Sequence, residues 1–390
     1  MEQLAQACEP ASFGKGNEDV FDETYRKAKK MDSELFSPTL DPSLTDLIKI
    51  ISANLLEGNQ ATRTIKTELY KLNIYGTHFI FIRLHLILCS RPGEGSFFKP
   101  HVDTPRSGKM FGSLVIVFPT PHEGGALLLR HRGHEWKFDS GQALAAANGQ
   151  PSIGYVAFFS DIEHEVAPVI SGHRVTLTYN LYFDDGGPVF ANDAVSEQFT
   201  PPQLGNEGAF REAFTALLES SEFMAGGGAL AFGLRHVYPI KDTGLKHVYD
   251  ILKGSDAVVY QCARMLGYEP VLYVDYREDE LRGVIIDEVA QFCPPFQAND
   301  GLIDIVRREG GIYVAEEGGW AKSDRQYGKP KEILEWVTPE TEFNRQSGTY
   351  PSYYGNEQGM NWVYGHVCLI IRIGRAGNRL AYPRYTNKAD

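Results

Sequence analysis

A histidine and an aspartate stand two positions apart at the end of a short alternating segment, FFKPHVD. In a β-strand, residues i and i+2 point to the same side, so His101 and Asp103 are expected to face one point. Taken alone, this pair reads equally well as a surface salt bridge. A second histidine, His164, follows after 60 intervening residues, within SDIEHEVAPV. Several strands are expected in that interval, so the chain is long enough to leave the strand of His101 and return beside it.

Two histidines and one carboxylate on one face of an octahedral ion are the ligand set of non-heme Fe(II) sites, which leave other coordination positions open. No cysteine is close in sequence to the three residues. We therefore predict that His101, Asp103 and His164 form a metal site and that the same three residues are catalytic.

Arg174 lies ten residues after His164, near the start of an alternating strand expected from residue 173 to residue 183. One face of this strand is apolar (Val175, Leu177, Tyr179, Leu181) and the other is polar (Arg174, Thr176, Thr178, Asn180). We expect the apolar face to pack against helices outside the sheet and the polar face to line a pocket. A buried arginine needs an anionic partner, and its fork matches a carboxylate in a two-point contact.

The whole pattern, His-x-Asp followed by a distal His and then Arg-x-Thr, resembles the Fe(II)- and 2-oxoglutarate-dependent dioxygenases. The resemblance is to the prolyl 4-hydroxylase-like group, of the type found widely in fungi. It covers roughly residues 66–183 and is carried by three segments: FFKPHVDTPRS, then SLVIVFP followed by PHEGGALLLRH, and SDIEHEVAPVISGHRVTLTYNLY. That group often has lysine at the arginine position, so this chain is a variant there.

The resemblance implies a double-stranded β-helix, or jelly-roll, that holds one Fe(II) through His101, Asp103 and His164. Arg174 matches the group that pairs with the distal carboxylate of 2-oxoglutarate, and Thr176 matches a hydroxyl that assists it. Tyr75, which shares an expected strand face with Lys71 and Asn73, resembles a tyrosine that contacts the cosubstrate. For Thr176 and Tyr75, a plain strand threonine and a packed core tyrosine are equally good readings.

The implied function is hydroxylation of a C–H bond in a peptide, prolyl or small-molecule substrate by an oxidoreductase. The implied cofactor is Fe(II), with 2-oxoglutarate and O₂ as cosubstrates, succinate and CO₂ as products, and ascorbate as an optional reductant. One rival is a binding protein that keeps iron and 2-oxoglutarate as a sensor or scaffold without turnover. A second rival is a cupin-like metalloenzyme that does not use 2-oxoglutarate.

Many short alternating segments separated by turn residues predict a sandwich or barrel around this site. The expected class is mainly β with flanking helices (α+β), with a jelly-roll followed by an α+β region. An amphipathic helix is expected from Asp41-Pro42 to about Gly58. The expected divisions are a helical lead-in (1–60), the jelly-roll (61–185), a linker (186–208) and a non-catalytic C-terminal α+β region (209–390). For the last of these, a degenerate second jelly-roll is one alternative.

A hydrophobic segment, THFIFIRLHLILCSR (77–91), stands where the resembled family has a short turn. Hairpin loops usually take two to five residues, so this segment is an insertion. It is either a retained short intron translated in frame or a real extra strand or lid.

Composition and charge argue against several other classes of protein. Lys+Arg 38 against Asp+Glu 50 gives a net charge of −12, which argues against a nucleic-acid partner. Five scattered cysteines form no CxxC pair, and the longest apolar stretch (78–89) is too short to span a bilayer. The first residues lack the basic and apolar regions of a signal peptide. We therefore expect a cytoplasmic or nuclear protein with no membrane partner.

Overall fold

The computed structural model describes residues 1–15, 18–56, 63–76, 95–103, 109–146, 152–184, 206–240, 244–279, 282–294, 296, 300–316, 327–354 and 357–382. The chain divides into unit 1 (Met1–Leu55 and Thr62–Phe199) and unit 2 (Leu56–Ala61 and Thr200–Asp390). Strands predominate in both units, which confirms the expected mainly β class with flanking helices. None of the helices in the described ranges is long and apolar enough to span a bilayer. The segments 77–91 and 186–205, expected as an insertion and as most of a linker, lie outside the described residues.

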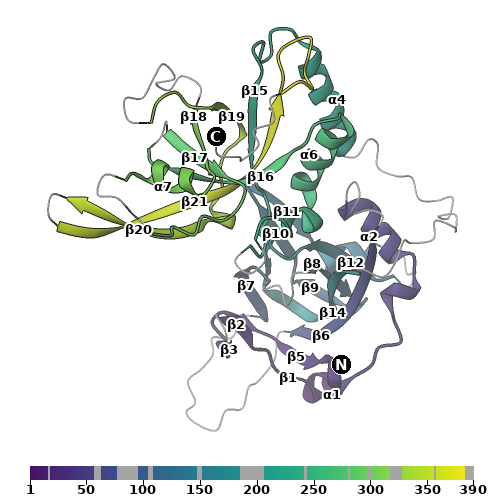
Figure 1. Ribbon diagram of the computed structural model, residues 1–390. Coiled ribbons are helices and arrows are strands. Elements are labelled where there is room, and N and C mark those ends of the chain that lie inside the picture. The colour runs from purple at the N-terminus through teal and green to yellow at the C-terminus, as the bar shows by residue number, and fades with distance from the viewer. Residues whose placement is uncertain are drawn as a thin grey trace. The chain divides into compact units, whose positions relative to one another are not determined.

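Unit 1 contains most of the strands of the chain (Figure 1). Its elements are α1 (Glu2–Ala7), β1 (Glu9–Pro10), β2 (Phe13–Lys15), β3 (Glu18–Val20), β4 (Arg26–Lys27), β5 (Lys29–Asp32), η1 (Ser33–Leu35), η2 (Pro42–Leu44), α2 (Leu47–Leu55), β6 (Thr64–Gly76), β7 (Phe97–His101), β8 (Met110–Val117), β9 (His122–Gly124), β10 (Leu127–His131), β11 (His134–Phe138), α3 (Ser140–Ala145), β12 (Gly154–Phe159), β13 (Glu163–Val166) and β14 (Val169–Asp184).

The strands of unit 1 form two main sheets. The larger has the order β1-β5-β6-β14-β8-β12, with β9 paired to β14 at one side, and the smaller has the order β11-β10-β13-β7-β4. The long strands β6 and β14 are antiparallel neighbours over almost their whole length. Strands close in sequence, such as β12, β13 and β14, therefore alternate between the sheets. This alternation places residues of β7, β13 and β14 around one interior.

The two faces of β14 have the roles that their alternation predicts. Val175, Leu177 and Leu181 are buried, and so is Tyr179, whose hydroxyl donates to the carbonyl of Leu40 at 3.0 Å. The segments η1 and η2 contact β6 of the same sheet, and α2 contacts β12. The apolar face therefore packs against the N-terminal chain, while the polar face is turned to the other side of the sheet.

The N-terminal segment is not simply a helical lead-in. Among the described residues before residue 33, only α1 is helical, and the short strands β4 and β5 extend both sheets. Arg26 of β4 is the partner of Phe98 on β7, and β5 pairs with β6. These strands are two to four residues long and largely polar, so they lack the alternation that reveals a strand in a sequence.

The helix expected from Asp41 is broken into two pieces. The Asp41 carboxylate accepts from Ser43 N at 2.9 Å, but this cap begins only the 3₁₀ turn η2. Thr45 is extended, and its hydroxyl accepts from Leu47 N at 3.2 Å, where α2 begins. Because Thr45 starts a new helix, Leu44 is left 85% exposed instead of packing. Gly58 lies outside the described residues.

Unit 2 combines strands with helices in alternation. Its elements are α4 (Asn206–Glu219), β15 (Gly228–Gly233), α5 (Val248–Ile251), α6 (Gly254–Met265), β16 (Val271–Arg277), β17 (Arg282–Ile286), α7 (Leu302–Arg308), β18 (Ile312–Glu316), β19 (Glu332–Thr338), η4 (Glu342–Asn344), β20 (Gln346–Tyr354) and β21 (Glu357–Ile373).

One mixed sheet organises unit 2. Its order is β15-β19-β18-β17-β16-β21-β20, and β15 also pairs with β21, so the sheet closes into a ring with β20 outside it. Ala229, Ile285 and Ile370 belong to the small apolar cluster inside this ring. Apolar residues of the opposite face form a larger core with α4, α6 and α7.

The strand pairing of unit 2 corrects one expectation for residues 209–390. The region is α+β, but β19 runs parallel to both of its neighbours, β15 and β18. A jelly-roll consists of two antiparallel sheets. The single closed mixed sheet is therefore not a degenerate jelly-roll. Sequence periodicity could not decide this, because it gives strands without their partners or directions.

His366 on β21 lies between two carboxylates of unit 2. Its Nδ1 is 2.9 Å from Glu340 Oε2, and its Nε2 is 3.2 Å from Glu342 Oε1. Hydrogen bonding to Glu340 raises the pKa of His366 above its ordinary value. Such a histidine stabilises the fold fully below about pH 6.5, and this contribution is lost as the pH rises through the folded-state pKa.

We expect His366→Gln to lower the free energy of unfolding by about 1 kcal/mol near pH 5.5 and by much less near pH 9. Denaturant unfolding of both proteins at the two pH values measures the difference. An equal loss at both would mean that packing, not the ion pair, is what the substitution removes.

Candidate metal centre and cosubstrate cavity

Strand register places the two predicted histidine ligands side by side. His164 on β13 is the direct antiparallel partner of His101 on β7, and the pairing shifts just after it, between His164 and Val166. Directly opposed residues on antiparallel strands have neighbouring side chains, and here the ring centres are 4.1 Å apart. Phe98 stacks on the His101 ring, with ring centres 3.5 Å apart. The two imidazoles are therefore held by register and by packing.

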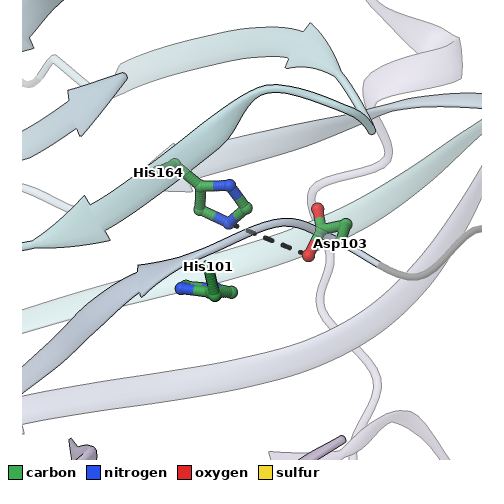
Figure 2. Close-up of side chains that lie close together, drawn as sticks. All are labelled: His101, Asp103 and His164. Carbon is green, nitrogen blue, oxygen red and sulfur yellow. Dashed lines mark ion pairs between the residues drawn. The ribbon is translucent and has the colours of Figure 1, made fainter. Parts of the chain in front are cut away.

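Asp103 completes the group from the segment that follows β7. Its Oδ1 lies 3.7 Å from His164 Nε2 (Figure 2), and its Oδ2 accepts from the Ser113 hydroxyl at 2.6 Å. One ligand atom from each of His101, Asp103 and His164 lies within 4.8 Å of the others. The structure thus brings together the three residues that the sequence singles out.

The hydrogen bonds of the two imidazoles leave Nε2 of each ring available to a metal ion. His101 Nδ1 lies 2.8 Å from the carbonyl of Lys99, and His164 Nδ1 lies 3.0 Å from the carbonyl of Ile162. A carbonyl only accepts, so each Nδ1 carries the proton and each Nε2 keeps a lone pair. Burial, together with the proximity of His164 and Arg26, lowers the pKa of His101 to about 3. Neutral imidazoles oriented in this way, with one carboxylate, fit Fe(II).

Ser113 is a residue that the sequence alone does not reveal. It is 1% exposed and holds the Asp103 carboxylate from β8, the next strand of the large sheet. We expect Ser113→Ala to weaken iron binding by about 10- to 100-fold while the protein stays folded, as loss of an outer partner of a ligand generally does. Competition with a chelator measures the affinity, and Ser171→Ala, at an exposed position of β14, is the control. Equal iron affinity in both variants would exclude a role for Ser113.

A cavity of about 590 Å³ opens on this group. The polar face of β14 forms part of its wall, as expected. The cavity is lined by all six of the residues predicted for the site, and these are His101, Asp103, His164, Arg174, Thr176 and Tyr75.

Arg174 is held in the cavity wall with part of its hydrogen-bonding capacity unused. It is 1% exposed, and its Nε donates to the Ser140 hydroxyl at 3.4 Å. Nη2 is buried and has no hydrogen-bond partner in the described part of the chain. Burial lowers the pKa of the Arg174 guanidinium. A buried cation with an unused donor is costly unless an anion completes it, so a carboxylate fits here.

Cross-strand partners place the other two predicted residues. Tyr75 on β6 is opposite Arg174, and its ring centre is 5.6 Å from the guanidinium carbon. Thr176 is opposite Asn73 and is 1% exposed. Gly125 leaves space for the arginine, because a Cβ there would lie 2.9 Å from Arg174 Cδ. All of these contacts lie around Arg174, at its end of the cavity.

Comparison with known families decides the class of this site. The family model of the 2OG-Fe(II) oxygenase superfamily matches residues 85–182, a range that includes the three predicted ligands and Arg174. This segment belongs to the 2OG-Fe(II) oxygenase superfamily. Residues 85–182 are therefore part of a 2-oxoglutarate-dependent oxidoreductase, with Fe(II) as its cofactor and 2-oxoglutarate as its cosubstrate.

Two solved structures resemble part of this chain at low identity. One is a prolyl-4-hydroxylase from Pseudomonas putida, at 15% identity and a TM-score of 0.26, with 47% of this chain and 81% of that chain covered. The other is an oxidoreductase of the 2OG-Fe(II) oxygenase family from Burkholderia pseudomallei, at 16% identity and a TM-score of 0.24, with 48% and 79% covered. No curated protein matches the chain.

Proposed function

We propose that unit 1 is a double-stranded β-helix that hydroxylates a C–H bond with Fe(II) and 2-oxoglutarate. His101, Asp103 and His164 would hold the metal, and Arg174 would bind the distal carboxylate of 2-oxoglutarate. Thr176 and Tyr75 would line that end of the cosubstrate site. The observation that carries the proposal is that one cavity contains both a three-ligand group and a buried arginine with an unused donor.

The residues of the chain do the binding and the positioning. The carbonyls of Lys99 and Ile162 keep each imidazole proton on Nδ1, so that both Nε2 atoms are available to the metal without loss of a proton. Ser113 fixes one carboxylate oxygen of Asp103 and leaves the other facing His164. When bound, Fe(II) and 2-oxoglutarate would supply the oxidation of the substrate C–H bond, with release of succinate and CO₂. The protein supplies geometry and a sheltered cavity.

The substrate class remains a peptide, a prolyl residue or a small molecule, and the fungal prolyl 4-hydroxylase-like type stays a prediction. Residues 209–390 are proposed to be non-catalytic, because no His-x-Asp pair occurs in that part of the sequence. These residues would then serve recognition rather than oxidation.

The test needs no substrate at first. Fe(II) and 2-oxoglutarate added without oxygen should give the weak visible charge-transfer band of a metal-bound 2-oxo acid. Admission of oxygen should then give slow formation of succinate, because members of this class turn over their cosubstrate alone. A band without succinate, under any substrate supplied, would instead favour the sensor or scaffold. A folded protein with no band would remove the proposal.

A further inference from the structure

The cavity wall contains two more buried cations, Lys71 and Arg26. Lys71 on β6 is opposite Thr178, four residues along β14 from Arg174, which is about 13 Å along a strand. Arg26 comes from β4 and donates from Nη2 to Asn73 Oδ1 at 2.8 Å. Asn73 in turn donates to the Thr178 hydroxyl at 3.2 Å. Arg26, Asn73, Thr178 and Lys71 therefore form one group, which we call the distal cationic group.

Arg26 lies beside the metal ligands. Its guanidinium carbon is 4.4 Å from the ring centre of Phe98, and Phe98 also stacks on the ring of His101. Nη1 donates to the carbonyl of Ser12 at 2.6 Å, but Nε is buried without a hydrogen-bond partner among the described residues. Arg26 is 6% exposed, and no described carboxylate forms an ion pair with it. The positive charge of Arg26 is therefore not neutralised by any described carboxylate.

Lys71 is also a buried cation. It is 8% exposed, and its Nζ lies 4.3 Å from the ring centre of Tyr70. No ion pair is formed by Lys71 within the described ranges. Burying two cations without acidic partners costs free energy that a purely structural wall would not need to spend.

The charges of the cavity do not balance without a further anion. Its lining has three cations, Arg26, Lys71 and Arg174, against two carboxylates, Asp19 and Asp103. Fe(II) adds two positive charges, which 2-oxoglutarate matches with its two carboxylates. One positive charge then remains unbalanced. We assign it to Arg26 and Lys71, because Arg174 is taken as the partner of 2-oxoglutarate.

An aromatic wall adjoins the same group. The Phe13 and Tyr25 ring centres are 4.4 Å apart, and the Tyr25 ring meets Phe98 edge-on at 6.0 Å. These rings line the cavity beside Arg26. A molecule with an apolar body and an anionic group would satisfy both the wall and the cations.

We propose that the distal cationic group binds a carboxylate of the substrate, with the substrate body on Phe13 and Tyr25. This inference rests on the proposed function, since it takes the Arg174 end as the place of 2-oxoglutarate. It makes the substrate an acid. The acid is either a small carboxylic acid or an acidic side chain of a peptide.

Calorimetry with two matched probe pairs tests this. The small pair is benzoate and benzamide, and the peptide pair is a capped tetrapeptide with one glutamate and its glutamine analogue. Each is titrated into the full chain without oxygen, with Fe(II) and saturating 2-oxoglutarate, and again into metal-free protein. We expect the carboxylate of at least one pair to bind 10-fold or more tightly than its amide. Which pair responds identifies the source of the acid.

Substitutions test whether the carboxylate binds at the distal cationic group. Lys71→Gln and Arg26→Gln should each weaken carboxylate binding by about 10- to 100-fold, the usual value of a hydrogen bond to a charged group, and leave amide binding unchanged. Lys66→Gln, at an exposed position of the same strand, is the matched control. Because Arg26 also holds the chain near Ser12, Lys71→Gln serves if Arg26→Gln does not fold.

The outcomes separate the inference from the function beneath it. Equal binding of acid and amide in a protein with the charge-transfer band would overturn the inference and leave the oxygenase proposal intact. Carboxylate binding that competes with 2-oxoglutarate would also overturn it, since the probe would then occupy Arg174. Selective binding to metal-free protein that shows no band when iron is added would support the distal cationic group and remove the proposed function.

Discussion

Replacement of His164 by alanine is expected to abolish iron binding and the turnover of 2-oxoglutarate. Loss of an outer partner of a ligand already costs about 10- to 100-fold in affinity, so loss of a ligand should exceed 100-fold. His164 is the buried member of the group, and the pair with His101 cannot be rebuilt from a neighbouring position, because adjacent residues of β13 face the other side. The charge-transfer band and the iron content after desalting both measure the effect.

The matched control is His134→Ala, which removes an exposed imidazole from β11 of the same sheet. It should retain the band at full strength. Folding of the His164 variant is verified by its unfolding transition, since the ring also contacts Phe158 at 4.8 Å. A folded His164→Ala protein that binds iron as tightly as the unchanged chain would refute the assignment of the metal centre.

The residues of the candidate site could be chosen from the sequence because their signals are local. The His-x-Asp pair shares a strand face, and the alternation of β14 separates Arg174 and Thr176 from Val175 and Leu177. What spacing cannot give is the partner across the sheet. The pairing of His164 with His101 and of Arg174 with Tyr75 depends on register, which hydrogen bonds between distant strands fix. Ser113 was missed for the same reason, since only the fold brings it to Asp103.

The least predictable part is the N-terminal contribution. Arg26 belongs to a strand of two residues, and nothing around it in the sequence distinguishes a cavity wall from a loose leader. Its burial comes from contacts with Asn73 and Phe98, more than forty positions away. Lys71 and Asn73 had a signal, because they alternate with Tyr75. That signal could indicate a shared face but not a second charged group.

Replacement of Arg174 by methionine is expected to weaken 2-oxoglutarate binding by about 100-fold, because truncating one partner of a buried charge pair costs about 2 to 5 kcal/mol. Iron binding should be retained, since Arg174 is not among the ligands. Titration of the charge-transfer band with 2-oxoglutarate gives the affinity. Arg130→Met is the control, because Arg130 forms its ion pairs with Glu135 and Glu165 outside the cavity. An unchanged affinity would favour a metalloenzyme that does not use 2-oxoglutarate.

The same substitution should have the opposite sign on the stability of the protein without 2-oxoglutarate. A structural arginine would lose its contacts, and the free energy of unfolding would fall by about 3 to 5 kcal/mol. Arg174 has an unused buried donor, so methionine in its place should leave the unfolding free energy unchanged or raise it. Saturating 2-oxoglutarate should reverse the order, because a 100-fold difference in affinity stabilises the unchanged chain by up to about 2.7 kcal/mol. A crossing of the two stabilities on addition of one small molecule is what a binding residue produces, and a packing residue does not.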